Sequence, residues 1–126
     1  MDLLKKHCMP CEAGTPPLSE TEENRLNNYV KWEIDRDGVH KIRTSYTFND
    51  FKESMAFANR VAAVAEEERH HPDLHISYRK VIVEIHTHAI LGLSVNDFVL
   101  AAKIDKMANL TELEKSRYST LSTQNG

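Results

Sequence analysis

The sequence has little of several features that would place a protein in a special class. No run of 18 or more apolar residues is present, so no membrane span is predicted. Lys5 and Lys6 are not followed by an apolar stretch, which predicts no secretory signal. Only two cysteines occur in the 126 residues. Without a secretory signal they indicate reduced thiols and a cytoplasmic location.

The chain also lacks a strong charge of either sign. Its formal net charge is −3 and its pI is near 6.1, which argues against a nucleic acid or an anionic membrane as the main partner. Hydrophobic residues make up 40% and charged residues 28%, as in ordinary soluble domains. A chain of this length buries roughly 65% of its unfolded surface. One domain that needs no metal or disulfide for its core is therefore expected.

Apolar periodicity and capping signals predict seven elements in the order α-β-β-α-β-β-α. Ser19 and Glu22 fit a capping box for the first helix. Asn49 is expected to cap the longest helix, which has apolar residues at three- and four-residue spacing. Those residues are Phe51, Met55, Ala58, Ala62 and Ala65. The elements are expected at about 19–28, 32–35, 40–48, 49–69, 75–78, 80–88 and 94–107.

This mixture of helices and hairpins is typical of an α+β fold, with an antiparallel sheet and helices packed on one face. Residues 1–17 contain Pro16-Pro17 and are interpreted as an irregular arm. Residues 18–108 form the predicted domain. Residues 109–126 are rich in Ser, Thr and charge, and we expect a polar, partly disordered tail there.

Histidine is the residue type whose distribution stands out. Five of the seven histidines fall within 19 residues, where an even spread would put about one. They are His70, His71, His75, His86 and His88. Histidine titrates near neutral pH and is the commonest metal ligand, so this cluster predicts either proton transfer or metal binding.

His70 and His71 follow the predicted end of the longest helix, where the negative end of the helix dipole stabilises imidazolium. Glu66 lies four residues before His70, and Glu67 four before His71, so each carboxylate is expected to reach one imidazole. Pro72 disfavours helical backbone at His71, which lets the two rings point in different directions. The same residues also fit a simple solvated helix end, and Glu66 alone fits a solvated helix face.

His88 and Asp97 complete a possible proton-transfer site. His88 is expected at the end of a strand, just before a loop, and Asp97 in the first turn of the last helix. The ordinary alternatives are a surface strand residue for His88 and a capping role for Asp97, because Ser94-x-x-Asp97 is close to a capping box. For Asp97 the two roles are compatible.

The sequence also allows two possible metal-binding sites. His86-x-His88 puts two imidazoles on one strand face, and His70 or His71 could supply a third ligand. Cys8-x2-Cys11 could bind zinc or form a disulfide, but a single such pair is half a zinc site and the sequence has no second pair.

The acidic, histidine and aromatic residues of this region follow one spacing pattern. It reads Glu66-x3-His70-His71-Pro72-x5-Tyr78-x9-His88-x8-Asp97. This pattern resembles the signature of the pterin-4a-carbinolamine dehydratase family, and every fixed position is matched. The similarity extends over about residues 8–107.

The resemblance implies one four-stranded antiparallel sheet with three helices, assembled into homodimers or homotetramers. It implies a lyase that removes water from 4a-hydroxytetrahydropterin to give quinonoid dihydropterin, which recycles the pterin of aromatic amino acid hydroxylases. His70 and His88 are then the acid/base pair, and Asp97 orients a histidine or stabilises its cation. His71 and Glu66 are assigned to substrate binding.

One general acid and one general base are enough for this dehydration, so no metal and no cofactor besides the pterin substrate are expected. The alternatives are a histidine-rich metal-binding protein and a non-enzymatic module that stabilises dimers of a transcription factor. The complete set of His70, His71 and His88 favours retained catalysis over the second alternative.

Overall fold

The computed structural model describes residues 2–10 and 12–125, with side chains for 2–10 and 12–110. Its elements follow the predicted α-β-β-α-β-β-α order, with two added 3-10 turns. They are η1 (Leu3–Lys5), α1 (Glu20–Asn27), β1 (Glu33–Asp35), β2 (Lys41–Thr47), α2 (Phe51–Glu68), β3 (Asp73–Ser77), β4 (Lys80–Ile85), η2 (His88–Ile90) and α3 (Val95–Asn125).

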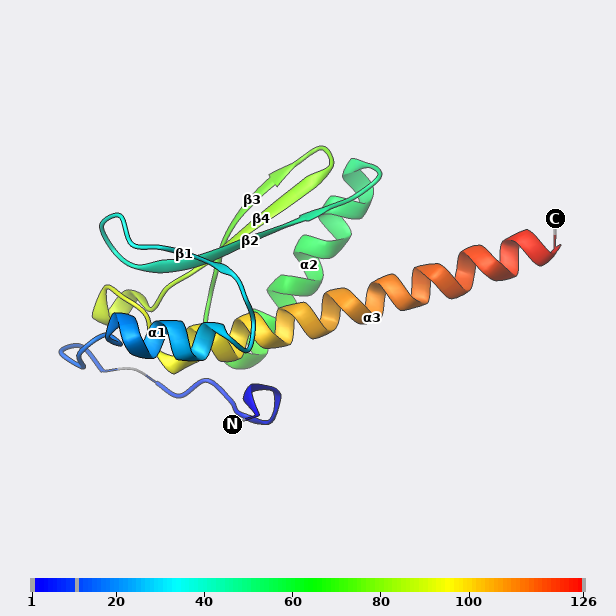
Figure 1. Cartoon of the computed structure of the whole chain (residues 1–126). Coiled ribbons are helices and arrows are strands. Elements are labelled where there is room, and N and C mark those ends of the chain that lie inside the picture. Colours follow the sequence, from blue (N-terminus) through cyan, green and yellow to red (C-terminus); the bar gives the residue numbers. More distant parts are fainter. Residues whose placement is uncertain (1, 11, 126) are drawn as a thin grey trace.

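The four strands form one antiparallel sheet in the order β1-β2-β4-β3. Figure 1 shows the three helices on the same side of this sheet. On β4, Val81, Val83 and Ile85 are fully buried, whereas the alternate residues Ile82 and Glu84 stay partly exposed. Because strand side chains alternate between faces, this pattern places the core between the sheet and the helices. The predicted α+β fold is confirmed.

The capping box of the first helix is also confirmed: Ser19 Oγ accepts from the backbone N–H of Glu22, and the Glu22 side chain bonds back to Ser19. The predicted cap of α2 is wrong by one residue. Asp50, not Asn49, is the N-cap, and its carboxylate accepts from the backbone N–H of Glu53 at 2.8 Å. A short carboxylate satisfies a free N–H at the helix start as well as Asn would.

The buried face of α2 also differs from the prediction. Phe51, Met55 and Ala62 are exposed. The inward face of α2 is decided by Phe57, which packs against the aromatic rings of β2 and of the residue that follows β2. The ring centroid of Phe57 lies 4.6 Å from that of Tyr46. The stripe that faces the sheet is therefore Ser54, Phe57, Ala58, Val61, Ala65 and Glu68.

The last helix is longer than predicted. It was expected to end near Met107, but α3 continues to Asn125. Its apolar periodicity is lost beyond that point, yet no Pro or Gly occurs before residue 126 to stop the helix. The division into an arm, a domain and a tail at 17/18 and 108/109 stays a prediction.

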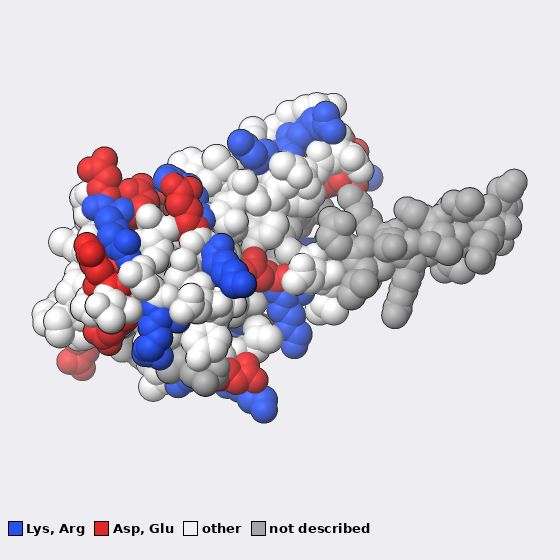
Figure 2. Space-filling model, in the orientation of Figure 1, with Lys and Arg blue, Asp and Glu red and all other residues white. Residues whose placement is uncertain are grey.

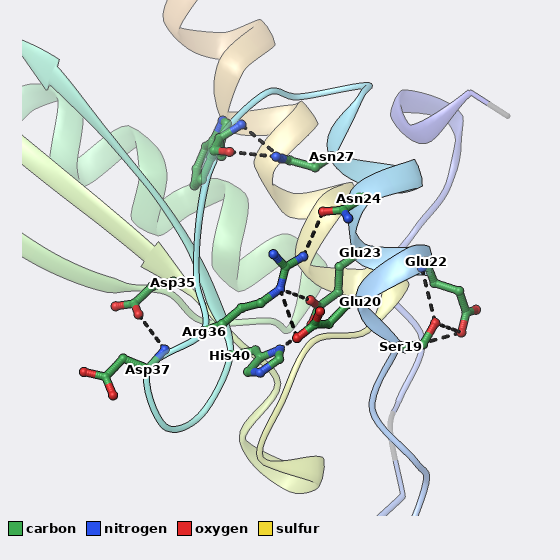
Figure 3. A network of polar contacts seen from close by, with 11 residues as sticks. Ser19, Glu20, Glu22, Glu23, Asn24, Asn27, Asp35, Arg36, Asp37 and His40 are labelled. Carbon is green, nitrogen blue, oxygen red and sulfur yellow. Dashed lines mark hydrogen bonds and ion pairs between the residues drawn. The ribbon is translucent and has the colours of Figure 1, made fainter.

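A buried carboxylate joins α1 to the β1–β2 hairpin (Figure 3). Glu23 is fully buried, and its two oxygens contact Arg36 Nε at 2.9 Å and His40 Nδ1 at 2.8 Å. The turn between these partners contains Gly38 at φ +74°, a conformation that favours glycine and was expected there. Paired in this way, the buried charge fixes the helix against the hairpin.

The surface carries both signs of charge. On the face seen in Figure 2, the Lys and Arg of the described residues are interspersed with Asp and Glu, with no large area of one sign. Within the described part of the chain, no helix is long and apolar enough to cross a membrane.

Candidate active site

The site begins where α2 ends. Arg69 adopts a left-handed conformation at φ +54°, and the backbone N–H of His70 returns to the carbonyl of Ala65 at 3.2 Å. A left-handed residue at this position closes a helix and turns the chain away from its axis. The predicted helix end before Pro72 is confirmed.

This turn changes the predicted carboxylate partners. The expected contacts of Glu66 with His70 and of Glu67 with His71 are absent among the described residues. Instead, His70 points inward to Asp97, and the Nε2 of His71 lies 3.6 Å from Glu66 Oε2. The four-residue spacing holds only within a continuous helix, and Arg69 interrupts it. Both members of the His71–Glu66 pair are mostly exposed.

Asp97 is the most buried group of the site. Its Oδ1 lies 2.6 Å from His70 Nε2, and its Oδ2 accepts from Thr87 Oγ1 and from the backbone N–H of Ser94, both at 2.8 Å. A buried carboxylate with three donors is both satisfied and fixed in place. Asp97 therefore makes the predicted capping contact with Ser94, the residue before α3, and it also contacts His70. Its role in proton transfer stays a prediction.

The contact fixes which nitrogen of His70 is available. Asp97 accepts the proton of Nε2, so in the neutral ring Nδ1 is the acceptor. The 2.6 Å separation is typical of a hydrogen bond to a charged partner. The pair thus has the orientation found in catalytic acid–base histidines, with one nitrogen anchored and the other free to act.

A second loop places His88. The predicted strand to His88 is wrong: β4 ends at Ile85, and His88 begins η2. The chain leaves the ladder because Thr87 bridges instead to Gly92, with its N–H bonded to the Gly92 carbonyl at 2.8 Å. Thr87 Oγ1 also lies 2.7 Å from Ser94 Oγ. His88 therefore sits on a short loop whose base is bonded to the start of α3.

Gly92 is required by close packing. A Cβ at this position would lie 2.7 Å from the Cβ of Pro17, inside any normal contact distance. The backbone N–H of Leu18 donates to the carbonyl of Leu93 beside it, at 2.9 Å. The end of the arm thus supports the loop that carries His88.

These elements enclose a pocket of about 720 Å³, within the range of small-molecule sites. His70, His71, Thr87 and His88 line it, so the structure brings the three predicted histidines together. Asp97 lies behind His70 and is fully buried. Glu66 is not among the lining residues, and its predicted role in substrate binding stays a prediction.

The N-terminal arm forms another wall of the pocket, which the sequence did not indicate. The backbone N–H of Cys8 donates to Glu68 Oε1 at 3.0 Å. The other oxygen of Glu68 contacts His7 Nδ1 and Lys103 Nζ, both at 2.9 Å. Burial acts to raise the pKa of Glu68, but these three partners outweigh it and lower the pKa to about 2. Glu68 thus joins the arm to α2 and α3 as a carboxylate.

Asn96 holds the next residue of the arm. Its Oδ1 accepts from the backbone N–H of Met9 at 2.8 Å, and its Nδ2 donates to the Met9 carbonyl. Both atoms of the amide are used on one residue, so the arm has a defined position at the pocket. Cys11, the second member of the predicted cysteine pair, lies outside the described residues.

A further histidine lies close to His88. The ring centroids of His86 and His88 are 4.1 Å apart. Burial, and then the neighbouring His88, lower the pKa of His86. The ligand atoms of these two residues and of Asp73 lie within 4.8 Å of one another. The metal set considered from the sequence therefore changes its third member, from His70 or His71 to Asp73.

Three residues of the site were missed by the sequence reasoning: Thr87, Asn96 and Glu68. Glu68 left a usable signal, because it continues the four- and three-residue spacing of Val61 and Ala65 and so falls on the buried face of α2. Thr87 and Asn96 left none, since polar residues beside a strand or in a first helical turn are common.

The fold and the site define a small α+β protein with a pocket that His70, His71 and His88 line. A family model described as "Pterin 4 alpha carbinolamine dehydratase" matches residues 16–107. The chain therefore belongs to this family.

Curated relatives support the same assignment. A protein of Rickettsia bellii named "Putative pterin-4-alpha-carbinolamine dehydratase" is 47% identical over 109 residues, covering 85% of this chain and 95% of its own. A protein of Chlorobium luteolum with the same name is 45% identical over 108 residues, covering 84% and 95%.

Solved structures agree with the fold. A protein of Brucella melitensis described as a "transcriptional coactivator/pterin dehydratase" superposes with a TM-score of 0.67 at 29% identity, covering 73% of this chain and 98% of its own. A pterin dehydratase-like RuBisCO assembly factor of the alpha-carboxysome has a TM-score of 0.53 at 20% identity, covering 61% and 88%. The second likeness supports the fold alone.

Proposed function

We propose that the protein catalyses the dehydration of 4a-hydroxytetrahydropterin to quinonoid dihydropterin and water. The elimination breaks the bond between C4a and the hydroxyl oxygen, and the N5–H bond gives up its proton as the C4a=N5 double bond forms. Hydroxide is a poor leaving group unless it is protonated. The reaction therefore needs one proton donor and one proton acceptor on the same bound ring.

His70 and His88 are the proposed donor and acceptor. Both line the pocket, and both are imidazoles, which can hold opposite protonation states near neutral pH. The contact of His70 with Asp97 supports its role, because the carboxylate anchors Nε2 and directs Nδ1 as the working atom. Asp97 acts here as a positioning residue for His70.

His71 is proposed to bind the pterin at the pocket rim. It lines the pocket but is mostly exposed. Its only ion-pair partner among the described residues is Glu66, whose Oε2 lies 3.6 Å from Nε2 of His71. In the same proposal, Glu66 acts on the substrate only through His71. The arm at Cys8 and Met9 forms a wall of the pocket beside the end of α2 and limits the access of water to the ring.

The placement of His70 and His88 in one pocket, with Asp97 bonded to His70, is the observation that carries this proposal. The test is an assay of the full-length protein with the carbinolamine generated in place by a pterin-dependent aromatic amino acid hydroxylase. Dehydration is expected to exceed the rate without protein. His75→Ala is a matched control, because His75 lies on the exposed part of β3 and does not line the pocket. A rate equal to the spontaneous one would refute the proposal.

A further inference from the structure

A group of three metal-ligating side chains lies beside the proposed catalytic pocket. In the β3–β4 ladder, Asp73 pairs with Glu84, so the two side chains share one face of the sheet. His86 lies two residues beyond Glu84 and faces the same side, diagonal to Asp73. His88 follows two residues later, with its ring centroid 4.1 Å from that of His86.

The distances suit a single metal ion. One ligand atom from each of Asp73, His86 and His88 lies within 4.8 Å of the other two. In the tetrahedral geometry that zinc prefers, ligand atoms at about 2.0–2.2 Å from the ion lie roughly 3.3–3.6 Å apart. Side-chain rotations must therefore bring the three atoms somewhat closer together when the ion binds.

One polar atom of this group is also buried without a partner. Nδ1 of His86 is buried and has no hydrogen-bond partner among the described residues. Such an atom costs free energy unless a ligand or a solvent molecule satisfies it. In the same described part of the chain, neither the Asp73 carboxylate nor the His88 ring makes a hydrogen bond or an ion pair. Asp73 and Asp97 add negative charge around His86, and Lys41 opposes them with one positive charge.

We infer that Asp73, His86 and His88 form a binding site for a divalent transition-metal ion, with Zn²⁺ as the ion that fits the donor set. Two neutral imidazoles and one carboxylate are characteristic zinc ligands, and three protein ligands leave a coordination position open to water. The ion is not proposed as a cofactor of the dehydration, because that reaction needs no metal.

Metal binding would act on the pocket through His88. A ring nitrogen that coordinates zinc gives its lone pair to the metal and cannot exchange a proton with a substrate. Bound zinc is therefore an inhibitor of the dehydratase. This second part rests on the proposed function, whereas zinc binding itself does not.

The test is isothermal titration calorimetry, which measures the affinity of the full-length protein for Zn²⁺ in the absence of pterin. His86→Ala and Asp73→Asn each remove one ligand, and both are expected to weaken binding at least roughly tenfold. His75→Ala is the matched control, since His75 lies on the same face of β3 outside the group and should leave the affinity unchanged. His86→Gln is measured as well, with a thermal melt of each variant to establish folding.

A zinc affinity that is the same in the folded His86 and Asp73 variants as in the wild type would overturn the site. An equal loss in His75→Ala, or a loss confined to a Cys8→Ser variant, would overturn it too. Inhibition is then measured separately: zinc should slow dehydration in the wild type and much less in His86→Ala. Zinc binding without any dehydratase activity would refute the proposed function and leave the metal site standing.

Discussion

Nε2 of His70 lies 2.6 Å from Oδ1 of Asp97, although 27 residues separate them in the sequence. His70 comes from the chain that leaves α2, and Asp97 from the first turn of α3. The carboxylate is fully buried, and its second oxygen is occupied by Thr87 and Ser94. The contact therefore has one available geometry, which sets the nitrogen that His70 presents to the pocket.

Asp97→Asn is expected to invert the tautomer of His70. The two donors, Thr87 and Ser94, need an oxygen, so the amide NH₂ must turn toward His70 Nε2 and donate to it. Nδ1 then carries the proton in the neutral ring. We expect a loss of dehydratase activity on the order of 10²-fold or more, as for other acid–base histidines with an inverted tautomer. The ¹⁵N shifts of the His70 ring check the tautomer directly.

Asp105→Asn is the matched control for that variant. Asp105 is also on α3 and also accepts hydrogen bonds, from Trp32 and Tyr46, but it does not line the pocket. It should cost stability and leave the turnover number close to that of the wild type. Equal losses of turnover in the two variants would mean that Asp97 has only a structural role.

Glu68→Gln is expected to reduce the loss of stability in acid. The pKa of Glu68 is lowered from 4.5 to about 2, so the folded state binds its proton less readily than the unfolded chain does. Its stabilising effect is therefore complete above about pH 4.5 and is lost as the pH falls toward 2. Across that window the wild type should lose on the order of 2–3 kcal/mol more than the variant.

Denaturant unfolding at pH 7 and at pH 2.5 measures this difference. Glu67→Gln is the control, because Glu67 is the exposed neighbour of Glu68 on α2. Its acid sensitivity should match that of the wild type. An unchanged pH dependence in Glu68→Gln would show that the contacts of Glu68 with His7 and Lys103 contribute nothing to stability.

Asn96→Ala is expected to release the arm from the pocket. The amide of Asn96 makes both hydrogen bonds to the backbone of Met9, and alanine can make neither. Amide exchange at Met9 should become faster. If the arm closes over the substrate, KM should rise by about 5- to 30-fold with a smaller change in kcat, the loss of about 1–2 kcal/mol of uniform binding.

Asn59→Ala, on the exposed face of α2, provides the comparison for this effect. It should change neither amide exchange at Met9 nor KM. Faster exchange in Asn96→Ala with an unchanged KM would show that the arm is held there for stability alone.

Gly92→Ala is expected to disturb the loop that carries His88. The added Cβ would meet Pro17 at 2.7 Å, so the loop or the arm must move, at a cost of about 1–3 kcal/mol in the free energy of unfolding. Pro17→Gly removes the atoms in conflict. In a double-mutant cycle the two changes should therefore compensate in part, as neighbouring residues do. Strictly additive losses would rule out this contact as the reason for glycine.

Much of the fold could be predicted because its signals are local. The capping box of Ser19 and Glu22, the turn at Gly38 and the alternation of Val81, Val83 and Ile85 each depend on residues close in sequence. The errors arose where distant packing decides. Packing of Phe57 against the sheet selected the buried face of α2, and the bridge of Thr87 to Gly92 moved His88 from a strand into a 3-10 turn.

The histidines of the site could be predicted from the sequence, but most of the hydrogen bonds around them could not. His70, His71 and His88 line one pocket, as the spacing pattern indicated. The helical pairing of Glu66 with His70 was wrong, because the four-residue spacing rule fails after the left-handed Arg69. The arm was missed altogether, since nothing in Cys8 or Met9 shows that their backbone bonds to Glu68 and Asn96. Such contacts depend on the main chain and leave no residue-type signal.

The most direct measurement is the dehydration rate of His70→Ala and His88→Ala, each compared with His75→Ala under conditions where the carbinolamine is made in place. Loss of one acid–base histidine should slow the catalysed step by roughly 10²–10⁴-fold. The control should retain the rate of the wild type. Full activity in both pocket variants would contradict the assignment of proton transfer to these two imidazoles.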